Sequence, residues 1–104
     1  MATSRAHIRI SRPPEEVWRV VSDAGAIATW FPAIETSTVS GGHRSATMVG
    51  GGAIEEDIVT NDPQLRRFQY RIVGGDLPVT FHLGTIDVLD DPGGSLVIYS
   101  TDIT

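Results

Sequence analysis

The sequence predicts an α+β domain: a curved antiparallel sheet of about seven strands, with two short helices after the first strand. Two observations lead to this prediction. Apolar residues at helical spacing are confined to positions 14–30, and short alternating segments separated by Gly, Pro, Asn and Asp clusters fill the chain after them. Turns this short join neighbouring antiparallel strands. A chain of 104 residues suits one domain, 1–104.

The first strand is expected over 5–11, where apolar and polar residues alternate. One face of this strand would carry its apolar side chains, Ala6, Ile8 and Ile10. The other face would carry its basic side chains, Arg5, His7 and Arg9. The alternation predicts a half-buried strand, with one face in the core and His7 on the surface.

Two short helices are expected next. The first begins at Pro13-Pro14, because a proline in the first turn of a helix has no hydrogen bond to lose, and the glutamates after it favour the positive end of the helix dipole. Its apolar residues form one face that would pack on the sheet: Pro14, Val17, Trp18 and Val21. A second helix over 24–30 would be capped by Asp23 and ended by Pro32.

Six further strands are expected after the helices. They lie near 34–40, 45–49, 53–60, 66–73, 79–89 and 95–103. The clearest alternation places Phe68, Tyr70 and Ile72 on one face, which leaves Arg67 and Arg71 on the convex, solvated face. A strand as long as 79–89 should bend or twist to stay in the sheet.

Composition excludes several classes of protein. The chain has no cysteine, which removes disulfides, thiolate metal sites and cysteine nucleophiles. Its net charge is −5 and it has no lysine, so it would repel nucleic acid and cannot form a lysine Schiff base or a lysine-dependent phosphate loop. No apolar segment is long enough for a signal peptide or a membrane span. We therefore expect a cytoplasmic protein with no nucleic-acid partner.

The helical region carries motifs that resemble a known superfamily. The chain has Pro-Pro-Glu-Glu-Val-Trp at 13–18, Ser-Asp at 22–23 and Trp-Phe-Pro at 30–32, after one expected strand and before six. This order resembles the START-related superfamily, and more narrowly the polyketide cyclase/dehydrase and lipid-transport group, often called SRPBCC. The resemblance covers about 6–103. It implies a helix-grip fold, in which a curved seven-stranded sheet folds around a long C-terminal helix with a cavity between them.

In one respect the chain departs from that pattern. It stops at Asp102-Ile103-Thr104, where the long C-terminal helix of the superfamily would begin. The concave face of the predicted sheet is apolar and needs a cover, and an exposed apolar face would drive association. Three explanations are open: a C-terminally truncated domain, a homodimer in which a second copy covers the face, or a partly open fold; the first two are favoured equally.

Candidate acid–base residues lie on faces expected to point inward. Glu56 shares a face with Ile54 and Ile58, whereas Glu55 points the other way, so the two glutamates cannot form a general acid/base pair. The resemblance implies an inward glutamate at Glu56, whose pKa could be raised so that it protonates a ligand. The alternative is a structural carboxylate at an edge or rim of the sheet, paired with an arginine, and this alternative is favoured.

His82 is in phase with Gly84, Ile86 and Val88 on the inward face of its strand. It is a candidate acid–base group or polar anchor for a ligand, although a packing role is favoured. No pair of histidines has the spacing of metal ligands, so neither a metal nor another cofactor is expected.

Aromatic side chains complete the candidate binding site. Tyr70, Tyr99 and Phe68 are expected on inward faces, where a buried hydroxyl needs a partner and could contact a ligand. The resemblance makes Trp30 and Phe31 lid or entrance residues. For each of these the alternative is an ordinary core aromatic, which is preferred for Phe68. The full candidate ligand-binding set is Trp30, Phe31, Glu56, Phe68, Tyr70, His82 and Tyr99, with Glu56 and His82 as candidates for catalysis.

Three functions are compatible with these features. The first, implied by the resemblance, is to bind or carry a small hydrophobic molecule. The second is that of a polyketide cyclase or dehydratase, which would use Glu56, His82 and the tyrosines to move protons. The third is that of a protein-interaction module, similar to the chaperone-activator branch of the superfamily. The first is favoured, because the inward faces carry few polar groups and no nucleophile.

Overall fold

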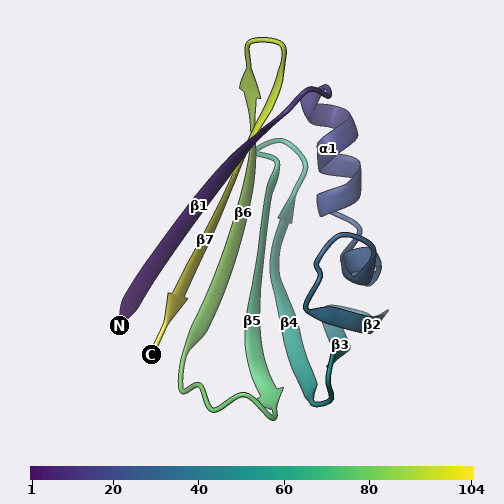
Figure 1. Cartoon of the computed structure of the whole chain (residues 1–104), viewed down its shortest axis with the longest axis vertical. Helices are drawn as coiled ribbons and strands as arrows, with labels where there is room; N and C mark the ends of the chain where they lie inside the picture. Colours follow the sequence, from purple (N-terminus) through teal and green to yellow (C-terminus); the bar gives the residue numbers. More distant parts are fainter.

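The chain forms one seven-stranded antiparallel sheet with two short helices, which confirms the predicted fold class (Figure 1). The computed structural model describes residues 1–104. Its elements in chain order are β1 (Ala2–Ile10), α1 (Pro14–Val21), the 3₁₀ helix η1 (Ala24–Thr29), β2 (Ile34–Ser40), β3 (His43–Met48), β4 (Ala53–Asp62), β5 (Arg67–Gly75), β6 (His82–Asp91) and β7 (Gly94–Ile103).

The strands from β2 to β7 form a meander, and β1 closes the order by pairing with β7. The sheet order is β1-β7-β6-β5-β4-β3-β2. Ala2 lies opposite Ile103, so the first and last strands run side by side and the two ends of the chain meet (Figure 1). β4 contains register shifts at Glu55/Glu56 and at Ile58/Thr60. Bulges of this kind increase the local twist and bend a strand, which helps the sheet to curve.

The core consists of two clusters, each beneath one helix. The cluster beneath α1 contains Val21, Phe68, Tyr70, Ile86 and Val88. The cluster beneath η1 contains Ile27, Ile34, Ala46 and Ile54. Each large apolar side chain buried in this way stabilises the fold by about 1.5–3 kcal/mol. The two helices therefore cover the middle of the sheet and its β2–β3 end, but not the end formed by β1.

β1 is longer and more exposed than the sequence predicted. It spans Ala2–Ile10, and every residue before Ile10 is exposed. The predicted half-burial is wrong: Ile8, on the apolar face, is 60% exposed. The reason is that alternation decides which way a side chain points, whereas burial also needs an element packed over that face. No helix lies over the inner face of β1.

The helices follow the prediction in position but differ in detail. In α1, Pro14 and Val21 are buried, and Trp18 packs against the core beneath it as expected. The second helix is a single 3₁₀ segment, and the predicted side-chain cap is wrong because Asp23 precedes η1 without capping it. Its backbone carbonyl instead accepts from the Ala26 amide at 3.0 Å, the i→i+3 pattern of a 3₁₀ turn. Neither helix is long and apolar enough to cross a bilayer.

Two strand starts differ from the prediction for identifiable reasons. β3 begins at His43 and not at 45, because His43 already pairs with Asp57 across the ladder. β6 begins at His82 and not at 79. Pro78 has no amide hydrogen to give to a ladder, and the amide of Thr80 donates to the Thr104 carbonyl instead.

Candidate functional site

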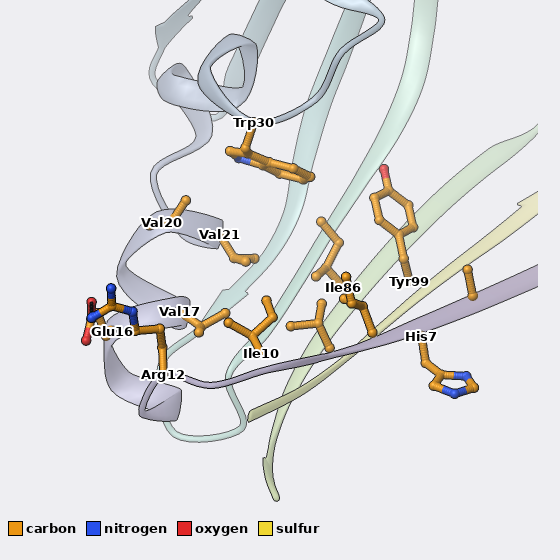
Figure 2. A pocket seen from close by; sticks show the side chains of 13 residues that line it. His7, Ile10, Arg12, Glu16, Val17, Val20, Val21, Trp30, Ile86 and Tyr99 are labelled. Atoms are coloured by element: carbon orange, nitrogen blue, oxygen red, sulfur yellow. Dashed lines mark ion pairs between the residues drawn. The ribbon is translucent and has the colours of Figure 1, made fainter. Parts of the chain in front are cut away.

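An apolar groove of about 430 Å³ runs between α1 and the inner face of β1 and β7 (Figure 2). Ten of its thirteen lining residues are hydrophobic. The strand side and the helix side contribute in particular Ala6, Ile8, Val97, Val17, Val20 and Val21. Pockets that hold small molecules have volumes of about 300–1,000 Å³ and mostly apolar walls, so this groove has the size and character of a small-molecule site.

The groove exists because the sheet is wider than the helix that covers it. α1 has eight residues, which corresponds to a length of about 12 Å, and it packs against β6 and β7. The apolar face of β1 extends beyond it, so Ile8 on the strand and Val20 on the helix are 60% and 48% exposed. An apolar molecule that covered these side chains would gain about 25 cal/mol for each Å² removed from water.

The rim of the groove is polar at the start of α1. Arg12 and Glu16 form an exposed ion pair there, with 3.7 Å between Nη1 and Oε1, and His7 lies farther along β1 (Figure 2). An exposed pair of this kind contributes at most about 1 kcal/mol to stability. These side chains therefore mark the solvent-exposed edge of the groove.

Two aromatic residues form the opposite end of the groove, and a third packs between them. Trp30 and Tyr99 both line it. Phe31 lies between them, with its ring centroid 5.7 Å from that of Trp30 and 6.2 Å from that of Tyr99, both edge-on. Such contacts add about 0.5–1.5 kcal/mol each beyond area burial. The Trp30 ring is thus held in place, yet its Nε1 is buried without a hydrogen-bond partner.

Tyr99 continues from the groove into the core. Its hydroxyl contacts the hydroxyl of Tyr70, which satisfies both buried oxygens. Burial raises the pKa of Tyr99 well above its usual value, the negative charge of Glu56 adds to the rise, and the charge of Arg44 opposes it. Tyr99 therefore remains a neutral phenol near pH 7, able to donate or accept a hydrogen bond but not to act as a base.

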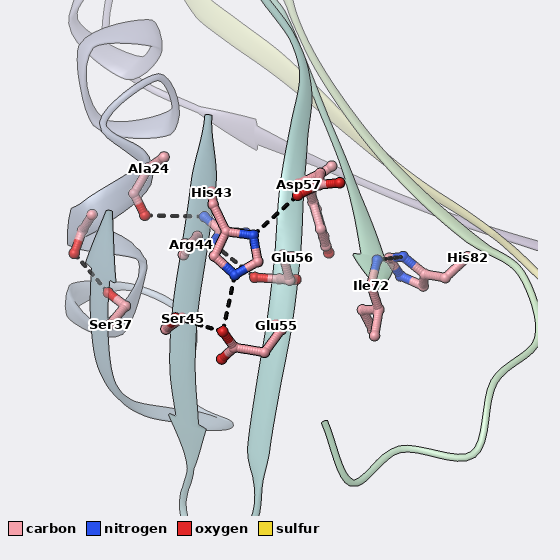
Figure 3. Close-up of polar contacts among 12 residues, drawn as sticks. Ala24, Ser37, His43, Arg44, Ser45, Glu55, Glu56, Asp57, Ile72 and His82 are labelled. Atoms are coloured by element: carbon pink, nitrogen blue, oxygen red, sulfur yellow. Dashed lines mark hydrogen bonds and ion pairs between the residues drawn. The ribbon is translucent and has the colours of Figure 1, made fainter. Parts of the chain in front are cut away.

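Glu56 is paired with Arg44 in the interior of the sheet (Figure 3). Arg44 Nε donates to Glu56 Oε1 at 2.7 Å, and Arg44 Nη1 donates to the Ala24 carbonyl at 3.0 Å. The guanidinium also lies 5.1 Å from the ring centroid of Tyr70. Glu56 therefore has the arginine partner that the sequence analysis favoured. It is only 4% exposed, so the pair lies in the core and not at an edge or rim of the sheet.

His82 completes the hydrogen bonding of the sheet at the start of β6. The β5–β6 ladder ends where Tyr70 lies opposite Gly84. Beyond that point His82 Nδ1 accepts from the amide of Ile72 at 3.1 Å (Figure 3), so the ring replaces a missing ladder bond. Burial lowers the pKa of His82 below its usual 6.5, and the positive charge of Arg71 lowers it further. The ring is therefore neutral at pH 7.

The seven residues predicted as ligand-binding all point to the inner face, but they divide into two groups. Trp30 and Tyr99 line the groove, and Phe31 packs against both. The others lie in the packed interior: Glu56, Phe68, Tyr70 and His82. Sequence reasoning missed the α1 side of the groove and Arg44. Arg44 is in phase with the buried Ala46 on β3, which is the signal that could have found it.

On the outer face, β3 and β4 are joined by a second polar cluster (Figure 3). His43 Nε2 lies 2.9 Å from Glu55 Oε1, and its Nδ1 lies 3.0 Å from Asp57 Oδ1. Ser45 Oγ also donates to Glu55. Glu55 and Asp57 raise the pKa of His43 by accepting hydrogen bonds from its ring. Nowhere in the chain are three or more His, Cys, Asp or Glu side chains grouped so that they could hold a metal ion.

Comparison with known proteins gives this architecture a family. The family described as polyketide cyclase / dehydrase and lipid transport matches the chain over residues 1–104. The chain belongs to the polyketide cyclase/dehydrase and lipid transport family. The resemblance found in the sequence is thereby confirmed. No curated protein matches the chain significantly.

Solved structures share the fold of the chain. The protein XoxI from Bacillus cereus has a TM-score of 0.94 and 29% identity, over 100% of this chain and 76% of its own. A START superfamily protein from Mycobacterium smegmatis has a TM-score of 0.83 and 15% identity, over 98% and 76% of the two chains. Norcoclaurine synthase from Thalictrum flavum has a TM-score of 0.79 and 20% identity, over 98% and 68%. The last two share the fold alone.

In this member of the polyketide cyclase/dehydrase and lipid transport family, the groove is the apolar hollow of the sheet's inner face. It is open along one side, apolar along most of its length and bounded by aromatic rings at one end. Its charged lining residues, Arg12 and Glu16, lie at the other end, and His7 lies beside β1 between the two ends (Figure 2).

Proposed function

We propose that this domain binds a small hydrophobic molecule in the groove between α1, β1 and β7. The observation that carries the proposal is a 430 Å³ volume in which ten of thirteen lining residues are hydrophobic. Membership of a family described by lipid transport supports the same conclusion. A monomeric domain rarely leaves such a surface without a use.

The partners of the candidate acid–base groups favour binding over catalysis. Glu56 is held by Arg44, and His82 accepts a backbone amide. Neither lines the groove. A general acid or base has to come within hydrogen-bond reach of the reacting group, and Tyr99 is the member of the predicted set with a titratable group that lines the groove. A cyclase or dehydratase reaction would therefore depend on a phenol whose pKa is raised.

The test is to measure binding of the neutral fluorescent probe N-phenyl-1-naphthylamine to the wild-type protein and two variants. Ile8→Asp places a charge on the wall of the groove at a side chain that is 60% exposed, so it leaves the core intact. Val73→Asp makes the same kind of change at a side chain of β5 that is 49% exposed and outside the groove. We expect Ile8→Asp to weaken binding at least tenfold and Val73→Asp to leave it unchanged. Equal binding by all three proteins would contradict the proposal.

The homodimer and the cytoplasmic location stay predictions, as does the extent of the domain. The open side of the groove is where a second copy of the chain would pack, with Ile8 at its centre. If a homodimer forms there, sedimentation velocity will show a concentration-dependent dimer for the wild type and a monomer for Ile8→Asp. A wild-type monomer at all concentrations would contradict it.

A further inference from the structure

β1 forms one edge of the sheet, and the side of its backbone that faces away from β7 has no partner (Figure 1). In an antiparallel pair, the amides and carbonyls of alternate residues point away from the neighbouring strand. Beyond the ladder with β7, no hydrogen bond in the chain reaches the backbone of 2–9. An unpaired edge of this kind is a template on which another chain can add a strand.

The devices that usually protect a sheet edge are present at β2 but missing at β1. Bulges, prolines, inward charges and covering elements all discourage pairing at an edge. β2 has a register shift between Ile34 and Thr36, and η1 lies against it, with Ser37 Oγ donating to the Gly25 carbonyl at 2.6 Å. β1 pairs with β7 over nine residues without a shift and contains no proline. Its inner face carries no charge: Ala2, Ser4, Ala6, Ile8 and Ile10.

The outer face of β1 is basic in a protein that is otherwise acidic. The net charge of the chain is −5, yet no acidic residue occurs before position 15. Arg5, His7 and Arg9 alternate with residues that line the groove, so they form a row on the opposite, outer face. One acid of the chain contacts this row, with Asp91 Oδ2 at 3.4 Å from Arg9 Nε. A strand that pairs with β1 therefore meets positive charge on this face.

These charges decide between a second copy of the chain and a partner of another sequence. Two β1 strands paired edge to edge and in phase would bring both basic rows together, and like charges opposite each other are destabilising. A strand with acidic residues at alternate positions would place carboxylates opposite Arg5 and Arg9, which is favourable. The apolar residues between its acids would lie beside Ala6 and Ile8, at the open side of the groove.

We propose that β1 is a docking edge for an extended acidic segment of another protein, in which Asp or Glu alternates with apolar residues. The segment adds a further strand to the sheet. Main-chain hydrogen bonds to β1 supply affinity, and the alternating side chains supply specificity. The edge and its charges do not depend on what the groove holds, so this inference stands apart from the proposed function.

The probe for this edge is a fluorescein-labelled peptide in which Glu and Val alternate, as long as the nine residues of β1. Its binding is measured by fluorescence anisotropy. Two control peptides test the pattern and the charge: one has the same composition with Glu and Val in separate blocks, and the other has Arg in place of Glu. The proteins are the wild type, Arg5→Glu and the matched control Arg19→Glu, which makes the same change of charge in the last turn of α1.

We expect the wild type to bind the alternating acidic peptide and neither control peptide, with an affinity that falls as the salt concentration rises. Arg5→Glu should weaken this binding about three- to tenfold, because a cross-strand attraction becomes a repulsion. Arg19→Glu should leave it unchanged. Absence of binding by the alternating peptide, equal binding of the block peptide, or equal effects of the two substitutions would overturn the inference.

N-Methylation of the peptide separates pairing along the edge from a purely ionic attraction. Only alternate amides of an added strand face β1. Of two alternating peptides, one N-methylated at every Val and the other at every Glu, one should therefore lose binding at least tenfold and the other should keep it. Equal binding of the two would overturn the inference. A wild-type dimer that the alternating peptide does not dissociate would assign the edge to a second copy, and would overturn it as well.

Discussion

Arg44 and Glu56 place opposite charges inside the sheet, where each depends on the other. Their side chains are 1% and 6% exposed, and their contact is 2.7 Å long. Burying one charge without the other is costly, whereas a well-packed apolar pair in the same place is often no less stable than the ions. The pair therefore fixes the packing of β3 against β4 more than it adds to the free energy of unfolding.

This view of the pair predicts the effect of removing one charge. Glu56→Gln keeps the shape of the side chain but leaves Arg44 as an unpaired buried cation, so we expect a loss of about 3–5 kcal/mol in the free energy of unfolding. Urea unfolding measures this loss. Asp57→Asn, at the next residue of β4 but on the exposed face, should cost less than about 1 kcal/mol.

A double variant separates a charge effect from general damage to the core. Arg44→Met with Glu56→Leu removes both ions and fills the space with apolar atoms. It should be more stable than Glu56→Gln alone. If the double variant is the less stable of the two, the pair stabilises the fold by its charge and this account is wrong.

His43 and His82 should give the stability opposite dependences on pH. The pKa of His43 is raised above 6.5 by Glu55 and Asp57, so its contribution is complete below pH 6.5 and is lost as the pH rises through the raised value. The pKa of His82 is lowered by burial, so its contribution is present above pH 6.5 and is lost as the pH falls through the lowered value.

We expect the stability of the wild type to decline as the pH rises above 6.5, because His43 loses its proton. In His43→Gln this contribution to the decline should be absent. The decline is measured by urea unfolding at a series of pH values between 6 and 9. NMR titration of the ring protons should place the pKa of His43 above 6.5 and that of His82 below it. Matching pH profiles for His43→Gln and the wild type would show that the cluster on the outer face does not act as described.

At the level of single residues, the sequence predicted which face of the sheet a side chain points to better than it predicted the residue that the side chain bonds to. It placed Glu56 and His82 on the inner face, because strand alternation fixes the direction of each side chain. It did not find Arg44, which sits between His43 and Ser45 in a polar stretch that looks like a turn. The bond that pairs Arg44 with Glu56 joins residues 12 positions apart, and only the register of β3 on β4 brings them together.

At the level of elements, β5 and β6 fit together through a glycine and an aromatic ring. Gly84 lies opposite Tyr70, and a Cβ atom at Gly84 would come within 2.5 Å of the Tyr70 ring. The ring occupies the space that a side chain of β6 would take. In this way Tyr70 reaches across β6 to Tyr99 on β7, which connects the core to the groove.

Gly84→Ala should therefore be destabilising although alanine suits a strand at least as well as glycine. The added methyl group forces the Tyr70 ring to move, and overpacking of this kind costs about 1–3 kcal/mol. Gly42→Ala is the matched control, because its Cβ would meet no atom within 4 Å. Urea unfolding compares the two variants, and similar stabilities would contradict the close packing of Gly84 and Tyr70.

The elements themselves could largely be read from the sequence, but their exposure could not. The order of strands and helices follows from periodicity and from turn residues, which are local properties. The exposure of β1 is not local. Its alternation is that of a strand with a buried face, yet Ile8 is 60% exposed because α1 is too short to reach over it.

At the level of the whole molecule, the proposed binding in the groove should be coupled to the stability of the fold. The core beneath the two helices is buried without any ligand, whereas the inner face of β1 is exposed and would be covered by a molecule in the groove. A ligand that binds only the folded state stabilises it by RT ln(1 + [L]/Kd), which is about 2.7 kcal/mol at a concentration of 100 Kd. The effect should be strongest where the ligand packs.

This predicts an uneven pattern of hydrogen exchange. N-Phenyl-1-naphthylamine at saturating concentration should slow exchange of the amides of β1 and α1 that open locally, because these elements form the walls of the groove. Amides of the β2–β3 hairpin lie at the other edge of the sheet and serve as the internal control. Where these amides exchange by local opening, the probe should change their exchange rates little. Equal protection of both edges would mean that the probe acts only through global stability, and stronger protection of the hairpin would place the binding site elsewhere.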